Sequence, residues 1–390
     1  MNTQIQKVTQ NIIERSKPYR ETYLSRLNEA DSNGVNRSAL GCSNLAHGFA
    51  ACSQGDKDIL SEDVVPNIAI VSAYNDMLSA HQPFATYPEI IKQALKDVGA
   101  TAQFAGGVPA MCDGVTQSQP GMELSLFSRD VIAQATAIAL SHNMFDDVNT
   151  VMGKGLESYT QLPELDASES SKIKWTQASL DITKKDIVGT VSEPFSHHGG
   201  LSILDGNVGR SVIKTSALKE KHLLIEAPAE VFDSQEELQD AYQAGQLNKD
   251  FVAVVRYQGP KSNGMPELHG LLPPLGALQD EGYNIAIVTD GRMSGASGKV
   301  ASAIHMTPEA SEGGMISKIM QGDMIRLDVE NSSLELLVDA DELETRKILV
   351  PDMSGNRFSM GRELFVSLRQ NVSGAEEGAS IFSLPGEESA

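Results

Sequence analysis

The residues best suited to chemistry lie in one glycine- and serine-rich segment, Ile285-Ala-Ile-Val-Thr-Asp-Gly-Arg-Met-Ser-Gly-Ala-Ser-Gly-Lys299. A buried strand is followed here by a loop whose backbone amides can point at an oxyanion, and Arg292 and Lys299 add positive charge. The segment is not a nucleotide-binding P-loop, because that motif would need other residues in place of Met293 and Val300. A glycine-rich turn with a solvated arginine is the alternative. The acidic, basic and hydroxyl side chains at one strand end favour a functional loop.

Two other loops carry acidic side chains that could bind a metal ion. The segment 256–269 contains Lys261 and Glu267. A carboxylate on such a loop suits Mg²⁺, which takes one or two protein carboxylates and keeps water ligands. In Met-Cys112-Asp113-Gly, a thiol lies beside a carboxylate. A surface carboxylate is the more common outcome for Glu267, and the pair Cys112 and Asp113 is a signal of low specificity, so neither fixes a metal site alone.

A pair of histidines stands in Ser196-His197-His198-Gly-Gly. Neighbouring side chains point apart on any regular element, so both histidines rarely bind one ion. We therefore interpret Ser196, His197 and His198 as hydrogen-bonding residues for a polyol or a phosphate, with a structural turn as the alternative.

The composition limits the partners. The 390-residue chain has 31 basic and 52 acidic side chains, a formal net charge of -21. This argues against nucleic acid, which needs clustered Lys and Arg, but a few local cations suffice for one phosphate. The first residues lack the apolar core of a signal peptide and no run could span a bilayer, so we expect a cytoplasmic protein with no membrane partner. Cys42, Cys52 and Cys112 are too few for a disulfide framework.

The predicted secondary structure changes from helices and strands in the first part of the chain to mostly strands in the second. Residues 3–30 and 122–142 show helical spacing of apolar side chains. Between them, a strand at 67–72 leads through a polar loop into a helix at 87–98, and ligands favour the carboxyl ends of such strands. No parallel strand is predicted after residue 145, although a doubly wound sheet would need one. We therefore predict an incomplete N-terminal α/β domain over residues 1–146 and a linker over 147–184.

Residues 185–390 predict a mostly β, barrel-like or swivelling domain with a few helices, so the fold class is α/β with a β-rich C-terminal domain. One helix is well marked, because Ser234 is an N-cap, Glu237 completes a capping box and Gly245 follows the end. Strands are expected at 187–191, 201–203, 223–227, 251–256, 284–288, 324–327 and 334–338.

Taken together, these segments resemble the dihydroxy-acid/6-phosphogluconate dehydratase family over essentially the whole chain. The Ser-Ala-His, Ser-His-His-Gly-Gly and Asn-Gly-Met-Pro-Glu-Leu-His forms are similar to the phosphogluconate branch. The matching motifs are Ser72-Ala-Tyr-Asn-Asp-Met-Leu-Ser-Ala-His81, Gly106-Gly-Val-Pro-Ala-Met-Cys-Asp-Gly-Val-Thr-Gln117, Gly121-Met-Glu-Leu-Ser-Leu126, Pro194-Phe-Ser-His-His-Gly-Gly200, Gln258-Gly-Pro-Lys-Ser-Asn-Gly-Met-Pro-Glu-Leu-His269 and Val288-Thr-Asp-Gly-Arg-Met-Ser-Gly-Ala-Ser-Gly298.

The resemblance implies a homodimeric carbon–oxygen lyase of the Entner–Doudoroff pathway of gluconate metabolism. Such an enzyme removes the C2 proton and the C3 hydroxyl of 6-phospho-D-gluconate and gives 2-dehydro-3-deoxy-6-phosphogluconate. A [4Fe–4S] cluster polarises the leaving hydroxyl, and a divalent metal, Mg or Mn, holds the substrate carboxylate. Asp113 and Glu267 match metal-ligand positions, and Ser294 matches the serine proposed as the base. The resemblance further assigns Cys112 to the cluster, and we assign Ser196, His197, His198, Lys261 and Arg292 to the phosphorylated sugar acid.

The chain departs from the family in its middle. The family's Gly-x-Cys-Asp-Lys loop and its later Cys loop with Thr-Ala-Asn have no counterpart after Phe145, and Ala80 stands where other branches place a further cysteine. On the order of 200 residues, the size of a domain, are absent. Cys112 alone cannot hold a cluster that normally needs three or four thiolates. The chain is therefore either a dehydratase, or an inactive remnant or sugar-phosphate-binding protein, and its iron content would separate the two.

Overall fold

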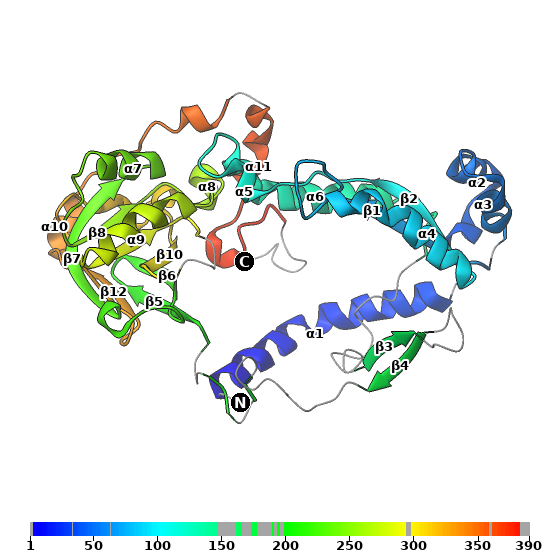
Figure 1. The fold of residues 1–390 in the computed structure, drawn as a ribbon, viewed down its shortest axis with the longest axis horizontal. Coiled ribbons are helices and arrows are strands. Elements are labelled where there is room, and N and C mark those ends of the chain that lie inside the picture. The colour runs from blue at the N-terminus through cyan, green and yellow to red at the C-terminus, as the bar shows by residue number, and fades with distance from the viewer. Residues whose placement is uncertain are drawn as a thin grey trace. The chain divides into compact units, whose positions relative to one another are not determined.

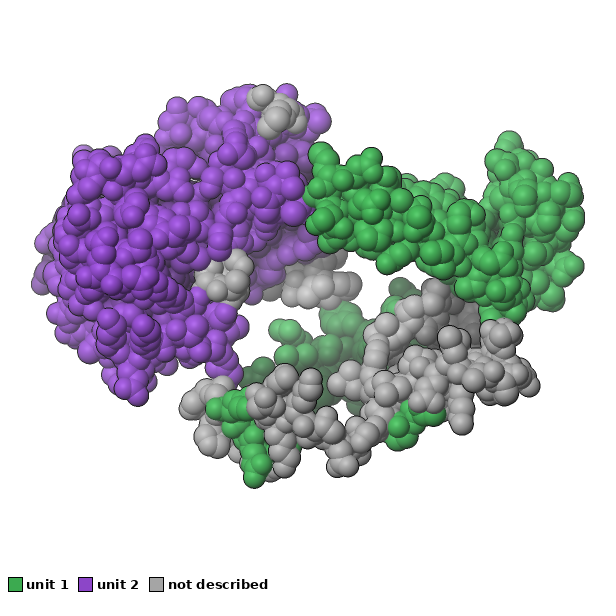
Figure 2. Space-filling model, in the orientation of Figure 1, with its two compact units in different colours: residues 1–110, 132–195 green, residues 111–131, 196–390 purple. Residues whose placement is uncertain are grey.

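The structure is a computed structural model that describes residues 3–32, 34–62, 64–146, 161–165, 173–177, 189–190, 193–195, 199–293, 298–358 and 361–382. The chain divides into two compact units (Figure 2). The N-terminal unit comprises residues 1–110 and 132–195, and the C-terminal unit comprises residues 111–131 and 196–390. Within the described ranges, none of the helices has both the length and the apolar character that crossing a bilayer requires.

The N-terminal unit contains a short parallel sheet (Figure 1). β1 (Asn67–Ser72) pairs in parallel with β2 (Thr101–Gly107), and α4 (Tyr87–Asp97) lies between them in the sequence. This strand–helix–strand unit is typical of α/β proteins and confirms the predicted class of the N-terminal region. The unit also contains α1 (Thr3–Ser32), α2 (Cys42–Phe49), α3 (Gln54–Leu60), the end of α6 (Ser125–Leu140), β3 (Gln161–Leu165) and β4 (Ile173–Gln177).

A buried arginine ties the start of β1 to the residues that follow α6. Arg37 is fully buried and donates hydrogen bonds to the carbonyl oxygens of Leu60 at 3.2 Å and Glu62 at 2.5 Å. Its guanidinium also lies 3.4 Å from the carboxylate of Asp146, which accepts the backbone N–H of Asn67 at 2.6 Å. A buried charge left without a partner is strongly destabilising, so this network holds the edge of the N-terminal sheet in place.

The C-terminal unit contains a closed barrel with the strand order β10-β6-β5-β12-β11-β7-β8-β9 (Figure 1). Three pairs are parallel in a row: β7 with β8, β8 with β9, and β9 with β10. Most of the other neighbouring pairs are antiparallel. The predicted barrel is thus confirmed. The strands are β5 (Leu201–Gly206), β6 (Gly209–Lys214), β7 (Leu224–Phe232), β8 (Phe251–Val255), β9 (Ile285–Thr289), β10 (Ala301–Thr307), β11 (Met324–Asp328) and β12 (Ser333–Leu336).

Two of these strands are buried on both faces. Every residue of β8 and β9 is buried. Val252 and Val254 pack into the barrel interior, while the alternating Ala253 and Val255 pack into a second cluster with Leu275 of α9 (Leu272–Asp280). Parallel strands covered on both faces have continuous apolar sequences, which explains why these two strands were readily predicted.

The helix predicted after Ser234 is present as α7 (Gln235–Gln243), and the hydroxyl of Ser234 accepts the N–H of Glu237 at 3.1 Å. Gly245 follows the helix with φ +69°, a conformation that glycine adopts without strain. The remaining helices of this unit are α5 (Asp113–Thr116), the start of α6, α8 (Pro260–Asn263), α10 (Ala340–Thr345) and α11 (Val366–Asn371). The predicted strand at 187–191 falls largely outside the described residues.

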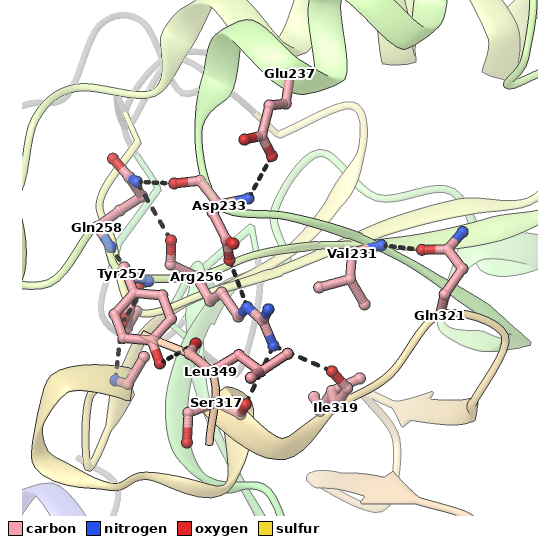
Figure 3. Close-up of polar contacts among 12 residues, drawn as sticks. Val231, Asp233, Glu237, Arg256, Tyr257, Gln258, Ser317, Ile319, Gln321 and Leu349 are labelled. Carbon is pink, nitrogen blue, oxygen red and sulfur yellow. Dashed lines mark hydrogen bonds and ion pairs between the residues drawn. The ribbon is translucent and has the colours of Figure 1, made fainter. Parts of the chain in front are cut away.

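Polar contacts hold the loop that leaves β8 (Figure 3). The guanidinium of Arg256 donates to Asp233 at 2.5 Å and to the carbonyl oxygens of Ser317 and Ile319 at 3.1 and 3.2 Å. The side-chain amide of Gln258 donates to the carbonyl oxygen of Asp233 at 2.8 Å. The loop therefore starts from a fixed position when it runs on toward Glu267.

A buried carboxylate joins three loops at the end of β9. Asp290 is 0% exposed and accepts the backbone N–H groups of Tyr257 at 3.2 Å, Gln258 at 2.8 Å and Ala310 at 2.9 Å. Burial raises the pKa of Asp290 to about 7, although the three N–H donors favour the charged form and oppose this rise.

We predict that Asp290→Asn lowers the free energy of unfolding by about 1–3 kcal/mol at acidic pH, because both oxygens of a carboxyl group, protonated or not, have lone pairs that can accept an N–H, whereas the nitrogen of an amide has none. The native pKa of about 7 lies above the value of 3.8 for a free carboxyl group. The carboxyl group therefore stabilises the fold most below pH 4, and this contribution is lost as the pH rises through 7. Urea unfolding between pH 4.5 and 7.5 should show wild type losing its advantage over the variant across this range.

The matched control for this measurement is Asp205→Asn, at an exposed carboxylate on β5. The free energy of unfolding of Asp205→Asn should differ little from that of wild type at every pH. A constant difference between wild type and Asp290→Asn would contradict the assignment of the titration to Asp290.

Candidate functional site

Three charged side chains from distant parts of the sequence meet in the C-terminal unit. Arg292 donates a hydrogen bond to the carboxylate of Asp113 at 3.0 Å and another to that of Glu267 at 3.1 Å. The sequence analysis assigned the two carboxylates to a metal ion and the arginine to the substrate. The structure places both carboxylates within hydrogen-bond distance of Arg292, and the roles of the three residues stay predictions.

Backbone contacts set this arrangement. Glu267 and Arg292 form an isolated parallel β-bridge, and the N–H of Leu268 donates to the carbonyl oxygen of Arg292 at 3.0 Å. Asp113 begins α5, within the short stretch 111–131 that groups with the barrel. Both carboxylates thus approach Arg292 from segments whose backbones are fixed.

The loop that carries Glu267 packs directly on the helix start beside Asp113. Gly264 has φ +66°, and a Cβ atom there would lie 2.2 Å from the carbonyl oxygen of Glu123, so only glycine fits. Glu123 is itself buried and pairs with the buried Arg362 at 3.0 Å. These contacts bring the 111–131 stretch onto the loop between β8 and α9.

The guanidinium of Arg292 makes four hydrogen bonds. Besides those to the carboxylates, Nε donates to the carbonyl oxygen of Met265 at 2.7 Å and one terminal nitrogen donates to the hydroxyl of Ser125 at 3.2 Å. The hydroxyl of Ser125 in turn donates to Asp113 at 2.5 Å. The planar guanidinium suits several carboxylate contacts at once. Two carboxylates facing one arginine leave the cluster one unit negative.

A histidine missed by the sequence analysis lies next to this cluster. The backbone N–H of His305 donates to the carbonyl oxygen of Gly291 at 2.9 Å, and His305 has φ +57°, which is uncommon for a non-glycine residue. Burial, together with the charge of Arg292, lowers the pKa of the imidazole, which favours its neutral form. Nothing in the local sequence marks His305, because it lies inside strand β10.

The described residues do not provide the iron–sulfur site that the resemblance implies, and Arg292 lies between the two carboxylates that it assigns to a divalent metal. They include no group of three or more His, Cys, Asp and Glu side chains that could hold a metal ion. Asp113 and Glu267 share the guanidinium of Arg292, which takes the place of a cation between them. The chain's three cysteines are free, with Cys42 and Cys52 in the N-terminal unit and Cys112 in the C-terminal unit. Since a [4Fe–4S] cluster is normally held by four cysteine thiolates, three cysteines do not complete such a site.

The other predicted site residues are not part of the Arg292 cluster as described. The amine of Lys261 forms an ion pair with Glu312. Its backbone N–H is accepted by the carboxylate of Glu309 at 3.1 Å. Cys112 is half-buried and directly precedes α5. Their roles stay predictions, and the remaining predicted residues lie outside the described ranges: Ser196, His197, His198 and Ser294.

Comparison with known proteins supports the family resemblance that the sequence motifs indicate. Residues 65–153 match the family description dihydroxy-acid/6-phosphogluconate dehydratase N-terminal, and residues 186–379 match the corresponding C-terminal description. The phosphogluconate dehydratases of Rhizobium meliloti (strain 1021) and Escherichia coli (strain K12) are each 35% identical, over 97% of this chain and 99% of the relative. That of Pseudomonas aeruginosa is 33% identical over 98% of this chain and 99% of the relative.

The length of these alignments is informative. The first two extend over 602 positions, whereas this chain has 390 residues, so at least 212 positions (602 − 390) have no counterpart here. The relatives are thus matched almost from end to end, but with long stretches that this chain lacks. By its sequence, this chain belongs to the dihydroxy-acid/6-phosphogluconate dehydratase family.

Proposed function

We propose that this chain recognises 6-phospho-D-gluconate and that, as it stands, it binds this compound without dehydrating it. The convergence of Asp113, Glu267 and Arg292 carries the proposal, because residues that match the family's motifs meet at one point. The similarity to relatives named phosphogluconate dehydratase supports the choice of ligand. The reaction of such enzymes would be the dehydration to 2-dehydro-3-deoxy-6-phosphogluconate.

The lack of turnover follows from the chain's own residues. Hydroxide is a poor leaving group, and stabilising it electrostatically is commonly worth several kcal/mol. The whole sequence has 3 cysteines, whereas a [4Fe–4S] cluster is normally held by four thiolates, so we infer that this chain does not hold the electrophile. An active dehydratase is the second candidate, and the matches over 97% of this chain favour it.

Ser294 remains the proposed base. A serine hydroxyl is a weak base at its usual pKa and needs a nearby cation or base to activate it. Arg292, two residues earlier, would supply that charge, but Asp113 and Glu267 already neutralise it. Lys261, the loop at 196–200 and the loop at 291–299 are proposed to receive the phosphate.

We also propose that the protein is a cytoplasmic homodimer. The compartment stays the expectation stated from the sequence, and the family membership supports the assembly. Light scattering of the purified chain would measure its mass directly. A monomer mass of 41.9 kDa in solution would contradict the dimer.

The decisive experiment is an anaerobic purification followed by iron and sulfide analysis and an assay with 6-phosphogluconate. We expect less than one iron per chain, no cluster absorbance and no turnover, but measurable binding by calorimetry. The phosphogluconate dehydratase of Escherichia coli, purified in the same way, is the positive control for cluster retention. Stoichiometric iron together with turnover would establish the active dehydratase instead, and the absence of any binding would overturn the proposed ligand.

A second prediction concerns Arg292. The change Arg292→Gln should lower the free energy of unfolding by about 1–3 kcal/mol, because two partly buried carboxylates lose their counter-charge. Partial solvent exposure keeps this figure below that of a fully buried pair. Millimolar Mn²⁺ should restore part of the lost stability in the variant and have a smaller effect on wild type, since a cation can then take the place of the guanidinium beside the carboxylates. Urea unfolding with and without Mn²⁺ measures both effects.

The matched control is Lys299→Gln, which removes an exposed ion pair with Asp280. Exposed pairs are worth about 0–1 kcal/mol, so this variant should resemble wild type. Equal stabilisation of wild type and Arg292→Gln by Mn²⁺ would mean that the metal binds without displacing Arg292.

A further inference from the structure

A cluster of uncharged polar side chains surrounds Gly270, three residues after Glu267. The amide of Gln235 donates to the hydroxyl of Ser118 at 2.9 Å, and the amide of Gln239 donates to the carbonyl oxygen of Gly270 at 3.1 Å. A Cβ atom on Gly270 would lie 2.8–2.9 Å from Gln239 Nε2, Gln235 Oε1 and Ser118 Oγ. Gly270 is not among the glycines with positive φ, so what this position requires is space rather than an unusual backbone.

This polar cluster contains two buried polar atoms that have no hydrogen-bond partner among the described residues. Gln235 is 5% exposed, and its Oε1 atom is buried without a hydrogen-bond partner among the described residues. The Nδ1 atom of His269, next to Gly270, is in the same state. Buried polar atoms are nearly always hydrogen-bonded, and exceptions call for a missing partner such as a ligand or water. Ser118 adds a φ of +55°, a strained value for serine of the kind found at binding sites.

Pockets lie on both sides of Ser118. An open pocket of about 730 Å³ is lined by Gln117, Ser118, Gln239, Tyr242 and His269, among others. A smaller pocket of about 300 Å³ is lined by Ser118, Gln235, Gln258, Asn263 and Glu267, among others. The two pockets adjoin Asp113 and Glu267, because Gly114 lines the first and Glu267 the second.

The chemistry of the lining favours hydroxyl groups over charged groups. Side-chain amides both donate and accept hydrogen bonds, as hydroxyl groups do. In the smaller pocket, Gln258 and Asn263 already bond to each other at 3.1 Å, and Asn356 donates to Asn263 at 2.9 Å. The side-chain amides of these three residues are thus already hydrogen-bonded to one another. The Oε1 atom of Gln235, in contrast, has no donor among the described residues. Carboxylates line the same pocket, so an anionic group would be repelled there.

We propose that Ser118, Gln235 and Gln239 form a binding site for the hydroxyl-bearing carbon chain of a polyol or sugar acid. The site would receive a hydroxyl group at the free Oε1 of Gln235, next to the carboxylates that Arg292 holds. For the identity of the acid, this inference rests on the proposed function. The recognition of a polyol chain rests on the amide cluster alone.

The test uses two substitutions and two ligands on the full chain. Gly270→Ala places a methyl group among the three polar atoms, and Gln235→Met removes the amide with little change in shape. Both variants should weaken binding of 6-phosphogluconate at least 10-fold in calorimetry. Gly276→Ala in α9 and Gln246→Met at an exposed position are the matched controls, because a Cβ on Gly276 meets its nearest atom at 3.8 Å. Thermal unfolding of each variant checks that the fold persists.

The second ligand separates this inference from the proposed function. D-glucitol, an uncharged polyol, should shift the side-chain amide NMR signals of Gln235 and Gln239 in wild type, and not those of Gln246. Unchanged phosphogluconate binding in a folded Gln235→Met variant would overturn the site while leaving the proposed function intact. If wild type fails to bind 6-phosphogluconate but glucitol shifts the two amides, the proposed function fails and the polyol site stands. If glucitol moves neither signal, the polyol site is wrong.

Discussion

The carboxylate of Asp290 is the interaction on which the described site depends. It ends β9 at a buried position and accepts backbone N–H groups from the loops that follow β8 and β10. One loop runs on to Glu267, and the other begins near Glu309, which accepts the N–H groups at the start of α8. Arg292 follows Asp290 by two residues, and its own backbone is held by the bridge to Glu267 and the bond from Leu268. A buried polar group that is fully bonded costs little, whereas a partly bonded one would destabilise all three loops at once.

Arg292 balances part of the negative charge of Asp113 and Glu267. A divalent cation between Asp113 and Glu267 would leave the group neutral, whereas the arginine leaves it one unit negative. An anionic substrate therefore meets a less favourable field here than it would beside a metal ion. The side-chain amides beyond Glu267 are not affected by this difference, because they recognise hydroxyl groups through hydrogen bonds rather than charge.

The sequence predicted those parts of the fold that local patterns determine. β8 and β9 are continuous apolar runs, and Ser234 with Glu237 marks the start of α7. β6 and β10 were missed. At the start of β6, Gly209 has φ +128° and no room for a Cβ beside Thr307, so this strand begins on a turn that the apolar pattern does not mark. β10 is rich in small residues and includes the positive φ of His305, so it lacks the alternation of an ordinary strand.

The site was predictable only through the family resemblance, since spacing along the chain does not bring Asp113 to Arg292. Even then, the resemblance selected the residues and not their partners. Contacts of Arg292 with Ser125 and Met265 arise because the 111–131 stretch packs on the barrel, which no local pattern encodes. The same packing brings Ser118 to Gln235 and so produces the amide cluster. Loss of the segment that carries the cluster cysteines need not disturb these contacts, because every residue that makes them lies in the C-terminal unit. A chain that loses its electrophile can therefore keep the scaffold for recognising a hydroxylated ligand.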